Sequence, residues 1–182
     1  MARLHGLKKV VPEPDTEGSW QDPRLRRGPA PEGADDYLQA VPGSMVYLDT
    51  NGSIYSVEQV PPYAAELLML WQAAATSQCS LCTSGLTLTE TLVAPLRAGN
   101  AMLADRYRRL LKESSDLQLV DVSLEVLERA AQLRADLGLR TPDAVHAASA
   151  LLGNCTHLIS NDPVFKRVHG LHVVVLNDLL AP

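Results

Sequence analysis

The sequence has no long apolar run. Its 182 residues contain no stretch that approaches the roughly 18 consecutive apolar residues of a membrane-spanning helix, and the first thirty residues lack the apolar core of a secretion signal. These absences argue against a membrane protein and against an exported one. We therefore expect a soluble, cytoplasmic protein with no membrane partner.

Cysteine is scarce, with only Cys79, Cys82 and Cys155 in the chain. An odd and small number of cysteines cannot cross-link a domain of this size, which fits a reducing compartment. Cys79 and Cys82 form a C-x-x-C pair, but their segment has the pattern of a strand, where side chains three residues apart point to opposite faces. Because such side chains cannot share a metal ion or a disulfide, we expect buried structural thiols.

Positive charge is not in excess. The chain has 16 basic and 21 acidic residues and a formal charge of -5, so no overall field attracts it to nucleic acid. Binding of nucleic acid would therefore depend on local basic clusters. The candidates are Arg106, Arg108, Arg109 and Lys112 on an expected helix, and the pair Lys166 and Arg167. Each cluster is also compatible with an ordinary solvated helix face.

The chain divides into two compositional parts. Residues 1–43 hold six of the twelve prolines and five of the eleven glycines, a composition that cannot bury enough apolar area to order itself. Hydrophobic residues make up 46% of the whole chain, which suffices for one domain. We expect a flexible extension over residues 1–44 and a folded domain over 45–182. The compact pattern begins so abruptly at Met45 that this methionine is a candidate natural start.

From Met45 onward, short apolar runs alternate with longer amphipathic stretches, without internal repeats. This is the rhythm of β-α-β units in a parallel sheet. The expected strands are 46–49, 80–83, 117–122, 157–160 and 172–176. The expected helices are 61–76, 87–98, 100–114, 123–137, 142–152 and a short one near 163–168. Thr141-Pro142 and Asp162-Pro163 match a helix cap followed by proline, and Gly138 and Gly153 match helix ends.

Four acidic residues recur beside these apolar segments. Asp49 ends the first strand and precedes an expected turn at residues 50–52, and Asp162 comes two residues after the fourth strand. Glu90 and Asp143 lie early in their helices. Ligands of an open parallel sheet bind outside the carboxyl ends of its strands. Parallel topology would therefore bring these acids together at one edge.

Each acid also has a structural explanation. Asp162 could cap the helix that starts at Pro163, which is worth about 1 kcal/mol. Glu90 and Asp143 could complement helix dipoles, worth about 0.3 to 1 kcal/mol each. Asp49 is harder to explain, because a carboxylate directly after Val-Tyr-Leu would be partly buried and would cost several kcal/mol unless it is paired or metal-bound. No Lys or Arg is adjacent to it.

The chemistry of a carboxylate cluster indicates a divalent cation. Several carboxylates in one cleft repel one another, which raises their pKa values unless a cation compensates. A site without His or Cys ligands suits Mg²⁺ or Mn²⁺, which prefer oxygen ligands. Such ions activate water and stabilise the charge on a phosphoryl group. The sequence therefore favours hydrolysis of phosphodiester bonds.

Four segments resemble the PIN-domain nucleases, in particular the VapC-like toxins of bacterial toxin–antitoxin systems. They occur in the order found in that family and span nearly all of residues 45–182. The segments are Val46-Tyr-Leu-Asp-Thr-Asn51, Leu86-Thr-Leu-Thr-Glu-Thr-Leu92, Leu139-Arg-Thr-Pro-Asp-Ala-Val-His146 and Leu158-Ile-Ser-Asn-Asp-Pro-Val-Phe165. The resemblance implies a three-layer α/β/α sandwich around a short, mostly parallel sheet.

The resemblance also implies roles for individual residues. The four acids would form the metal site: Asp49 and Asp143 would be the principal metal ligands, Glu90 would hold or orient metal-bound water, and Asp162 would complete the shell. Asn51 and Ser160 match polar positions beside that site. The implied protein is a Mg²⁺- or Mn²⁺-dependent endoribonuclease and a dimer, with a cognate antitoxin as partner. Its RNA would contact the basic residues Arg106, Arg109, Lys112, Lys166 and Arg167.

Two features stand apart from this pattern. Gly52-Ser53 replaces an apolar pair that commonly follows the Asp-Thr-Asn element. His146 lies three residues after Asp143, on a similar helix face. We interpret this histidine as a packed or surface residue in preference to a catalytic one.

Two other functions are compatible with the sequence. A PIN-like module could bind RNA or a protein without cutting, although it would have little need for clustered carboxylates. A different α/β phosphohydrolase or a phospho-acceptor receiver domain is less consistent. A haloacid-dehalogenase type would need an acid at the position of Asn51, and a receiver domain would need paired acids near the first strand.

Overall fold

The structure is a computed structural model, and it describes residues 42–180. The extension expected over residues 1–44 lies outside the described residues except for its last three. The strands are β1 (Met45–Leu48), β2 (Ser80–Ser84), β3 (Leu117–Val120), β4 (His157–Ser160) and β5 (His172–Val175). The α-helices are α2 (Thr50–Glu58), α3 (Ala64–Ala75), α4 (Leu86–Arg97), α5 (Ala101–Glu113), α6 (Leu124–Leu137) and α7 (Thr141–Leu152). Two 3₁₀ helices, η3 (Pro163–Arg167) and η4 (Leu176–Leu180), follow β4 and β5.

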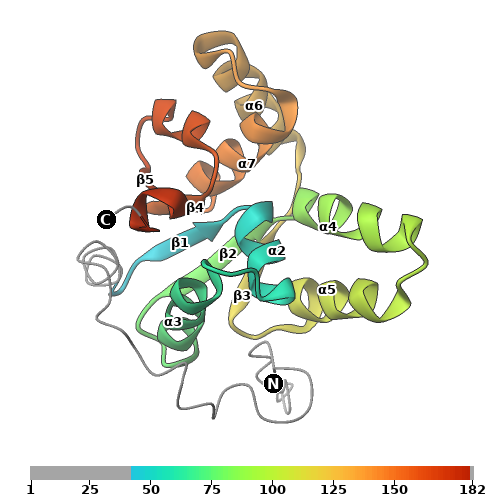
Figure 1. Cartoon of the computed structure of the whole chain (residues 1–182). Coiled ribbons are helices and arrows are strands. Elements are labelled where there is room, and N and C mark those ends of the chain that lie inside the picture. The colour runs from blue at the N-terminus through green and yellow to red at the C-terminus, as the bar shows by residue number, and fades with distance from the viewer. Residues whose placement is uncertain (1–41, 181–182) are drawn as a thin grey trace, which may run out of the picture.

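The five strands form one sheet in the order β3-β2-β1-β4-β5, and every neighbouring pair is parallel. The chain moves outward from β1 through β2 to β3, and then returns to the other side of β1 with β4 and β5 (Figure 1). The strand order therefore reverses at β1 and β4. In sheets of this kind, the crevice at such a reversal is the usual ligand site.

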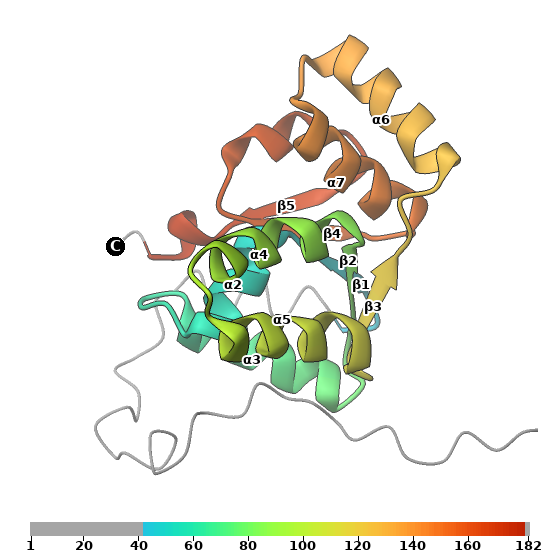
Figure 2. The ribbon, with the colours of Figure 1, turned by 90° about the vertical axis from the view of Figure 1, so that its right-hand side faces the viewer.

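Both faces of the sheet are buried, and the side chains of each strand alternate between them. Val46 and Leu48 belong to one core cluster and Tyr47 to the other, as the period of two in a strand requires. Helices α3 and α5 cover the first face. Helix α7 lies on the second face, and α6 packs on the outer side of α7 (Figure 2). The arrangement is a three-layer α/β/α sandwich, which confirms the expected fold class.

The cysteines follow the same alternation. Cys79 packs in the first cluster, whereas Cys82 and Cys155 pack in the second. All three are free and buried, which confirms their expected role as structural thiols. Within residues 42–180, no helix is both long and apolar enough to cross a membrane.

The predicted strands and helices are present, with boundaries within three residues of the expected ones. Helix α2 is the main exception, because residues 50–52 were expected to form a turn. The side chain of Asp49 accepts a hydrogen bond from the Gly52 N–H and begins a helix there instead. The expected cap at Thr141 is also wrong. Arg140 is the N-cap of α7 and makes no side-chain cap bond.

Candidate active site

The carboxyl ends of β1 and β4 lie side by side, since Leu48 is in register with Ile159. Asp49 follows the first of these strands directly. Ser160 is the last residue of the second, and Asp162 lies two residues beyond it. The predicted placement of Asp49 and Asp162 at one edge of the sheet therefore agrees with the observed topology.

Asp49 is almost fully buried, with 4% of its surface exposed. One carboxylate oxygen accepts the Gly52 N–H at 3.0 Å, and the other accepts a short hydrogen bond from the Ser160 hydroxyl. Burial raises the pKa of Asp49, against the opposing effects of the Ser160 and Gly52 hydrogen bonds, His146 and the Asn51 backbone N–H. These groups offset part of the desolvation of this carboxylate.

Ser160 links Asp49 to Asp162. Its hydroxyl donates to Asp49, and its oxygen accepts the Asp162 N–H at 2.9 Å. The Asp162 carboxylate accepts the Val164 N–H at 2.8 Å and caps η3, as its position before Pro163 predicts. Ser160 therefore contacts the carboxylate of Asp49 and the backbone of Asp162, while its supporting role in the site stays a prediction.

Asp143 lies in the first turn of α7 and is half-buried. Burial and then the negative charge of Asp162 raise the pKa of Asp143, while Arg140 and His146 act in the opposite direction. The two carboxylates are therefore close enough to repel each other. Such a like-charge pair favours a cation between or beside them.

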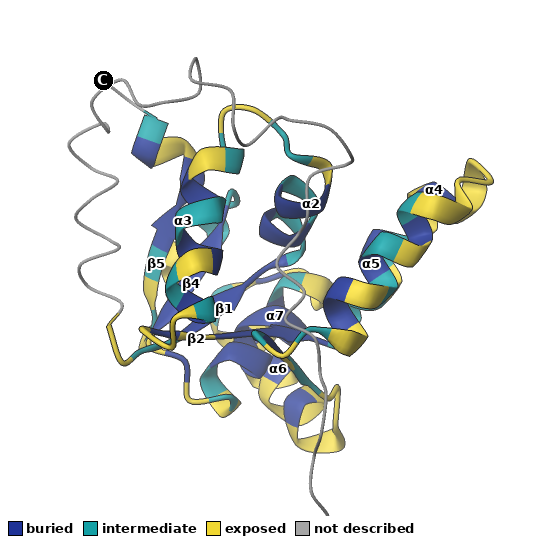
Figure 3. Ribbon diagram, turned by 90° about the horizontal axis from the view of Figure 1, so that it is seen from below, coloured by how far each residue is buried: buried dark blue, intermediate teal, exposed yellow. Residues whose placement is uncertain are grey.

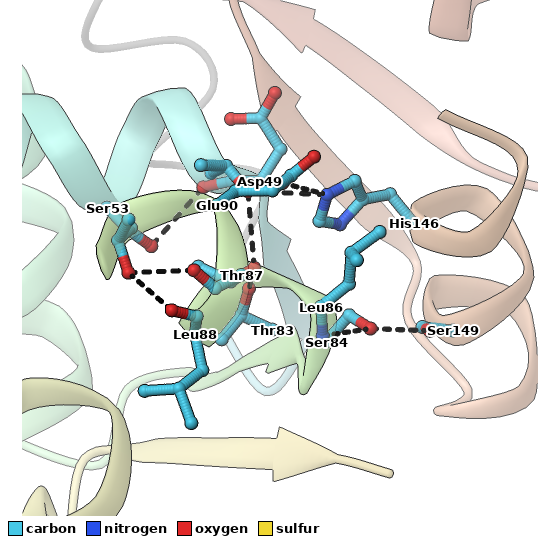
Figure 4. A network of polar contacts seen from close by, with 12 residues as sticks. Asp49, Ser53, Thr83, Ser84, Leu86, Thr87, Leu88, Glu90, His146 and Ser149 are labelled. Carbon is cyan, nitrogen blue, oxygen red and sulfur yellow. Dashed lines mark hydrogen bonds and ion pairs between the residues drawn. The ribbon is translucent and has the colours of Figure 1, made fainter. Parts of the chain in front are cut away.

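Glu90 projects from α4 toward α7. Its carboxylate accepts hydrogen bonds from His146 Nε2 at 2.9 Å and, at a short distance, from the Thr50 hydroxyl. Figure 4 shows Asp49, Glu90 and His146 gathered at this place from separate elements. Burial acts to raise the pKa of Glu90, but the hydrogen bonds from His146 and Thr50 and the charge of His146 outweigh it, and the pKa is lowered.

The sequence did not identify two residues that contact Glu90. His146 is buried, with 4% of its surface exposed, and both ring nitrogens have partners. Its spacing from Asp143 was the available signal, although that spacing alone also fits a packed residue. Thr50 was assigned to a turn, which gave no reason to expect its hydroxyl near Glu90.

The predicted basic residues are divided between α5 and η3. Arg106 donates to the Val57 carbonyl at 2.6 Å, which is a structural contact. Arg109 lines a hollow with acidic neighbours Asp105 and Glu113. Lys166 pairs with Asp178 at 2.8 Å, whereas Lys112 and Arg167 are exposed. Lys166 and Arg167 come soon after Asp162 in the sequence. Along the chain, this pair is therefore closer to an acid of the site than the basic residues of α5 are.

The four acids offer oxygen donors, the set that Mg²⁺ and Mn²⁺ prefer. As the side chains stand in residues 42–180, no group of three or more His, Cys, Asp or Glu is arranged to hold a metal ion. Asp49 is directed to Gly52 and Ser160, and Glu90 to His146 and Thr50. The donor chemistry fits a hard divalent ion, and the repulsion between Asp143 and Asp162 is the observation that favours one.

Comparison with known proteins identifies relatives of this fold. A family model described as PIN domain matches residues 46–171. Structural similarity extends to a toxin–antitoxin complex from Klebsiella pneumoniae, with 25% identity, a TM-score of 0.54 and coverage of 72% of this chain and 97% of that one. No curated protein sequence matches the chain.

Two further structures are similar in fold at lower identity. VapBC2 from Rickettsia felis, bound to a DNA fragment from its promoter, has 21% identity and a TM-score of 0.58, over 71% of this chain and 97% of that one. VapC20 from Mycobacterium tuberculosis is described as a sarcin-ricin loop cleaving toxin. It has 16% identity and a TM-score of 0.56, and the match covers 68% of this chain and 95% of that one.

Proposed function

This chain belongs to the PIN-domain family, and from that membership and the geometry of its acids we propose that it is a metal-dependent endoribonuclease. The observation that carries the proposal is the placement of Asp49 and Asp162 at the adjacent ends of β1 and β4, where the strand order reverses. Asp49 is hydrogen-bonded to Ser160, whose oxygen in turn accepts the N–H of Asp162. Asp143 is close enough to Asp162 for the two charges to interact.

The proposed site requires a hard divalent cation. Asp49, Asp143 and Asp162 would hold the ion, and the ion would activate water and stabilise the charge of the phosphoryl group. Glu90 would hold or orient metal-bound water. Its lowered pKa keeps this carboxylate ionised at neutral pH, so that it can accept a proton or a hydrogen bond.

RNA as the substrate and toxin as the biological role are the finer parts of the proposal. The resemblance of the four sequence segments to VapC-like toxins supports both. The similarity to the toxin–antitoxin complex from Klebsiella pneumoniae supports a cognate antitoxin as partner. Expression of the chain in bacteria should then arrest growth, and Asp49→Asn should abolish the arrest. Growth at the normal rate with the wild-type chain present would contradict the toxin role.

The direct test is incubation of the purified protein with mixed RNA, with Mg²⁺ or with excess chelator. We expect cleavage only with the metal, and none with Asp49→Asn, because the substitution removes a charge from the proposed metal site. A thermal melt of the variant serves as control for folding. Cleavage that persists in chelator would contradict the metal-dependent mechanism.

A second candidate function is a PIN-like module that binds RNA or protein without cutting. The present side-chain arrangement favours it to some extent, since Glu90 is paired with His146 and no three-ligand group is formed among residues 42–180. The same incubation separates the two. A module of this kind would retain RNA in a filter-binding assay while the RNA stays intact with Mg²⁺.

A further inference from the structure

His146 connects the interior of the sheet to the proposed acidic site. Its Nδ1 lies 2.7 Å from the Tyr47 hydroxyl, and its Nε2 lies 2.9 Å from the Glu90 carboxylate. The first contact reaches from α7 to β1. The second reaches from α7 to α4 (Figure 4). One buried side chain thus joins three elements that are far apart in the sequence.

The partners determine where the imidazole protons lie. An ionised carboxylate only accepts hydrogen bonds, so Nε2 must carry a proton and donate it to Glu90. Tyr47 is fully buried, and its phenol remains protonated at neutral pH. The Tyr47 hydroxyl holds the other ring nitrogen, Nδ1, at 2.7 Å. Tyr47 therefore orients the ring so that Nε2 faces and donates to Glu90.

The imidazole of His146 is buried but faces polar groups. Along α7 its neighbours Ala144, Ala147 and Ala150 are buried apolar residues. A buried imidazole is unfavourable unless its nitrogens are hydrogen-bonded. Among residues 42–180, its partners are Tyr47, Glu90 and the more distant Thr50 hydroxyl at 3.3 Å.

We propose that His146, oriented by Tyr47, is a positioning residue that fixes the Glu90 carboxylate in the nuclease site. The inference rests on the proposed function. Glu90 projects from a single helix and is 30% exposed, so without His146 only Thr50 restrains its carboxylate. Groups that orient a residue of a metal site in this way typically contribute about 10- to 100-fold to metal affinity or activity.

Two substitutions of His146 separate positioning from packing. His146→Leu fills the space without a donor, and His146→Gln offers an amide N–H that can donate to Glu90. We expect His146→Leu to lower kcat about 10- to 100-fold with little change in the KM for RNA, and His146→Gln to recover much of the loss. The matched control is His172→Gln on the exposed position of β5, which should keep the wild-type kcat.

A second measurement does not depend on activity. Nitrogen-15 NMR of the metal-free protein should show a proton on His146 Nε2 that is hydrogen-bonded to Glu90. Tyr47→Phe should weaken this hydrogen bond, because the ring then loses the contact that orients it. An Nε2 without a proton in the wild-type protein would overturn the inference, even if His146→Leu fails to fold.

The outcomes distinguish this inference from the proposed function. If the wild-type protein cleaves RNA and a folded His146→Leu variant has the same kcat and the same Mg²⁺ requirement, the positioning role is overturned while the nuclease remains. If the wild-type protein does not cleave RNA with any metal, the proposed function and the positioning role both fail. Loss in His146→Leu together with recovery in His146→Gln supports the inference.

Discussion

At the scale of single residues, the acids of the site affect stability in opposite directions. The pKa of Asp49 is raised mainly by burial, and that of Asp143 by burial and by Asp162. A carboxyl group with a raised folded pKa contributes stability that is fully present below its unfolded pKa and is lost as pH rises through its folded pKa. Glu90 has a lowered pKa, so its contribution is present above its ordinary value and is lost as pH falls through the folded one.

The raised pKa of Asp143 predicts how the melting temperature of Asp143→Asn depends on pH in the absence of metal. At neutral pH the variant should melt at a higher temperature than the wild type, because it lacks the repulsion with Asp162. The difference should shrink as pH falls through the folded pKa of Asp143, since both proteins then carry a neutral group at this position. Thermal melts between about pH 7 and pH 4.5 measure this difference.

Mg²⁺ provides a second arm of this experiment. A ligand that binds the folded state raises the melting temperature, so Mg²⁺ should stabilise the wild type at neutral pH and Asp143→Asn much less. The exposed Asp136 on α6 supplies the control, because Asp136→Asn should melt like the wild type under all these conditions. A lower melting temperature for Asp143→Asn at neutral pH would indicate a structural role for this carboxylate.

At the scale of elements, α2 is the helix that shapes the site. It starts at the cap formed by Asp49, carries Thr50 toward Glu90, and is tied to α3 by the hydrogen bond from Trp71 Nε1 to the Ser56 hydroxyl at 2.9 Å. Gly52 lies in its first turn. A Cβ at this position would come 2.3 Å from Leu48 Cδ1, so the helix and β1 approach each other closely only because residue 52 is glycine.

Gly52→Ala should therefore destabilise the protein. The buried Leu48 side chain would have to move, and overpacking of this kind costs about 1 to 3 kcal/mol. Gly85→Ala is the matched control, because the nearest neighbour of a Cβ there is the Val120 carbonyl oxygen at an ordinary 3.6 Å. Its free energy of unfolding should stay within about 0.5 kcal/mol of the wild type. Equal effects of the two substitutions in chemical denaturation would contradict the close approach of α2 to β1.

The same helix shows where sequence reasoning reaches its limit. The short apolar run of Val46, Tyr47 and Leu48 predicts a strand, and the position of Asp49 predicts an acid at its end. Thr50-Asn51-Gly52 has poor helix propensity, however, and the helix forms there because of the cap and the packing against Leu48. The contacts of His146 with Tyr47 and Glu90 span 99 and 56 residues, so no local pattern predicts them.

At the scale of the whole molecule, apolar side chains remain exposed on the hairpin of α4 and α5. Leu96 is 59% and Met102 is 80% exposed, and both lie near the tip of this hairpin, which projects from the sandwich (Figure 3). Leu124, also 80% exposed, begins α6 in a different layer. The resemblance to VapC-like toxins implies a dimer, and we propose that its interface is this hairpin, because Leu96 and Met102 are exposed apolar side chains from two adjoining helices.

The double substitution Leu96→Glu and Met102→Glu should convert the dimer into a monomer. Burial of one such side chain in an interface contributes about 1.5 to 3 kcal/mol to the free energy of association. Leu96 and Met102 each occur twice in a symmetric dimer. The dissociation constant should therefore rise by several orders of magnitude. Sedimentation velocity measures the mass of each protein. Leu124→Glu is matched to Met102 in exposure but lies outside the hairpin, and should leave the dimer intact. Two outcomes would exclude the hairpin as the dimer interface. In the first, the wild-type protein sediments as a monomer even at high concentration. In the second, only Leu124→Glu abolishes the dimer.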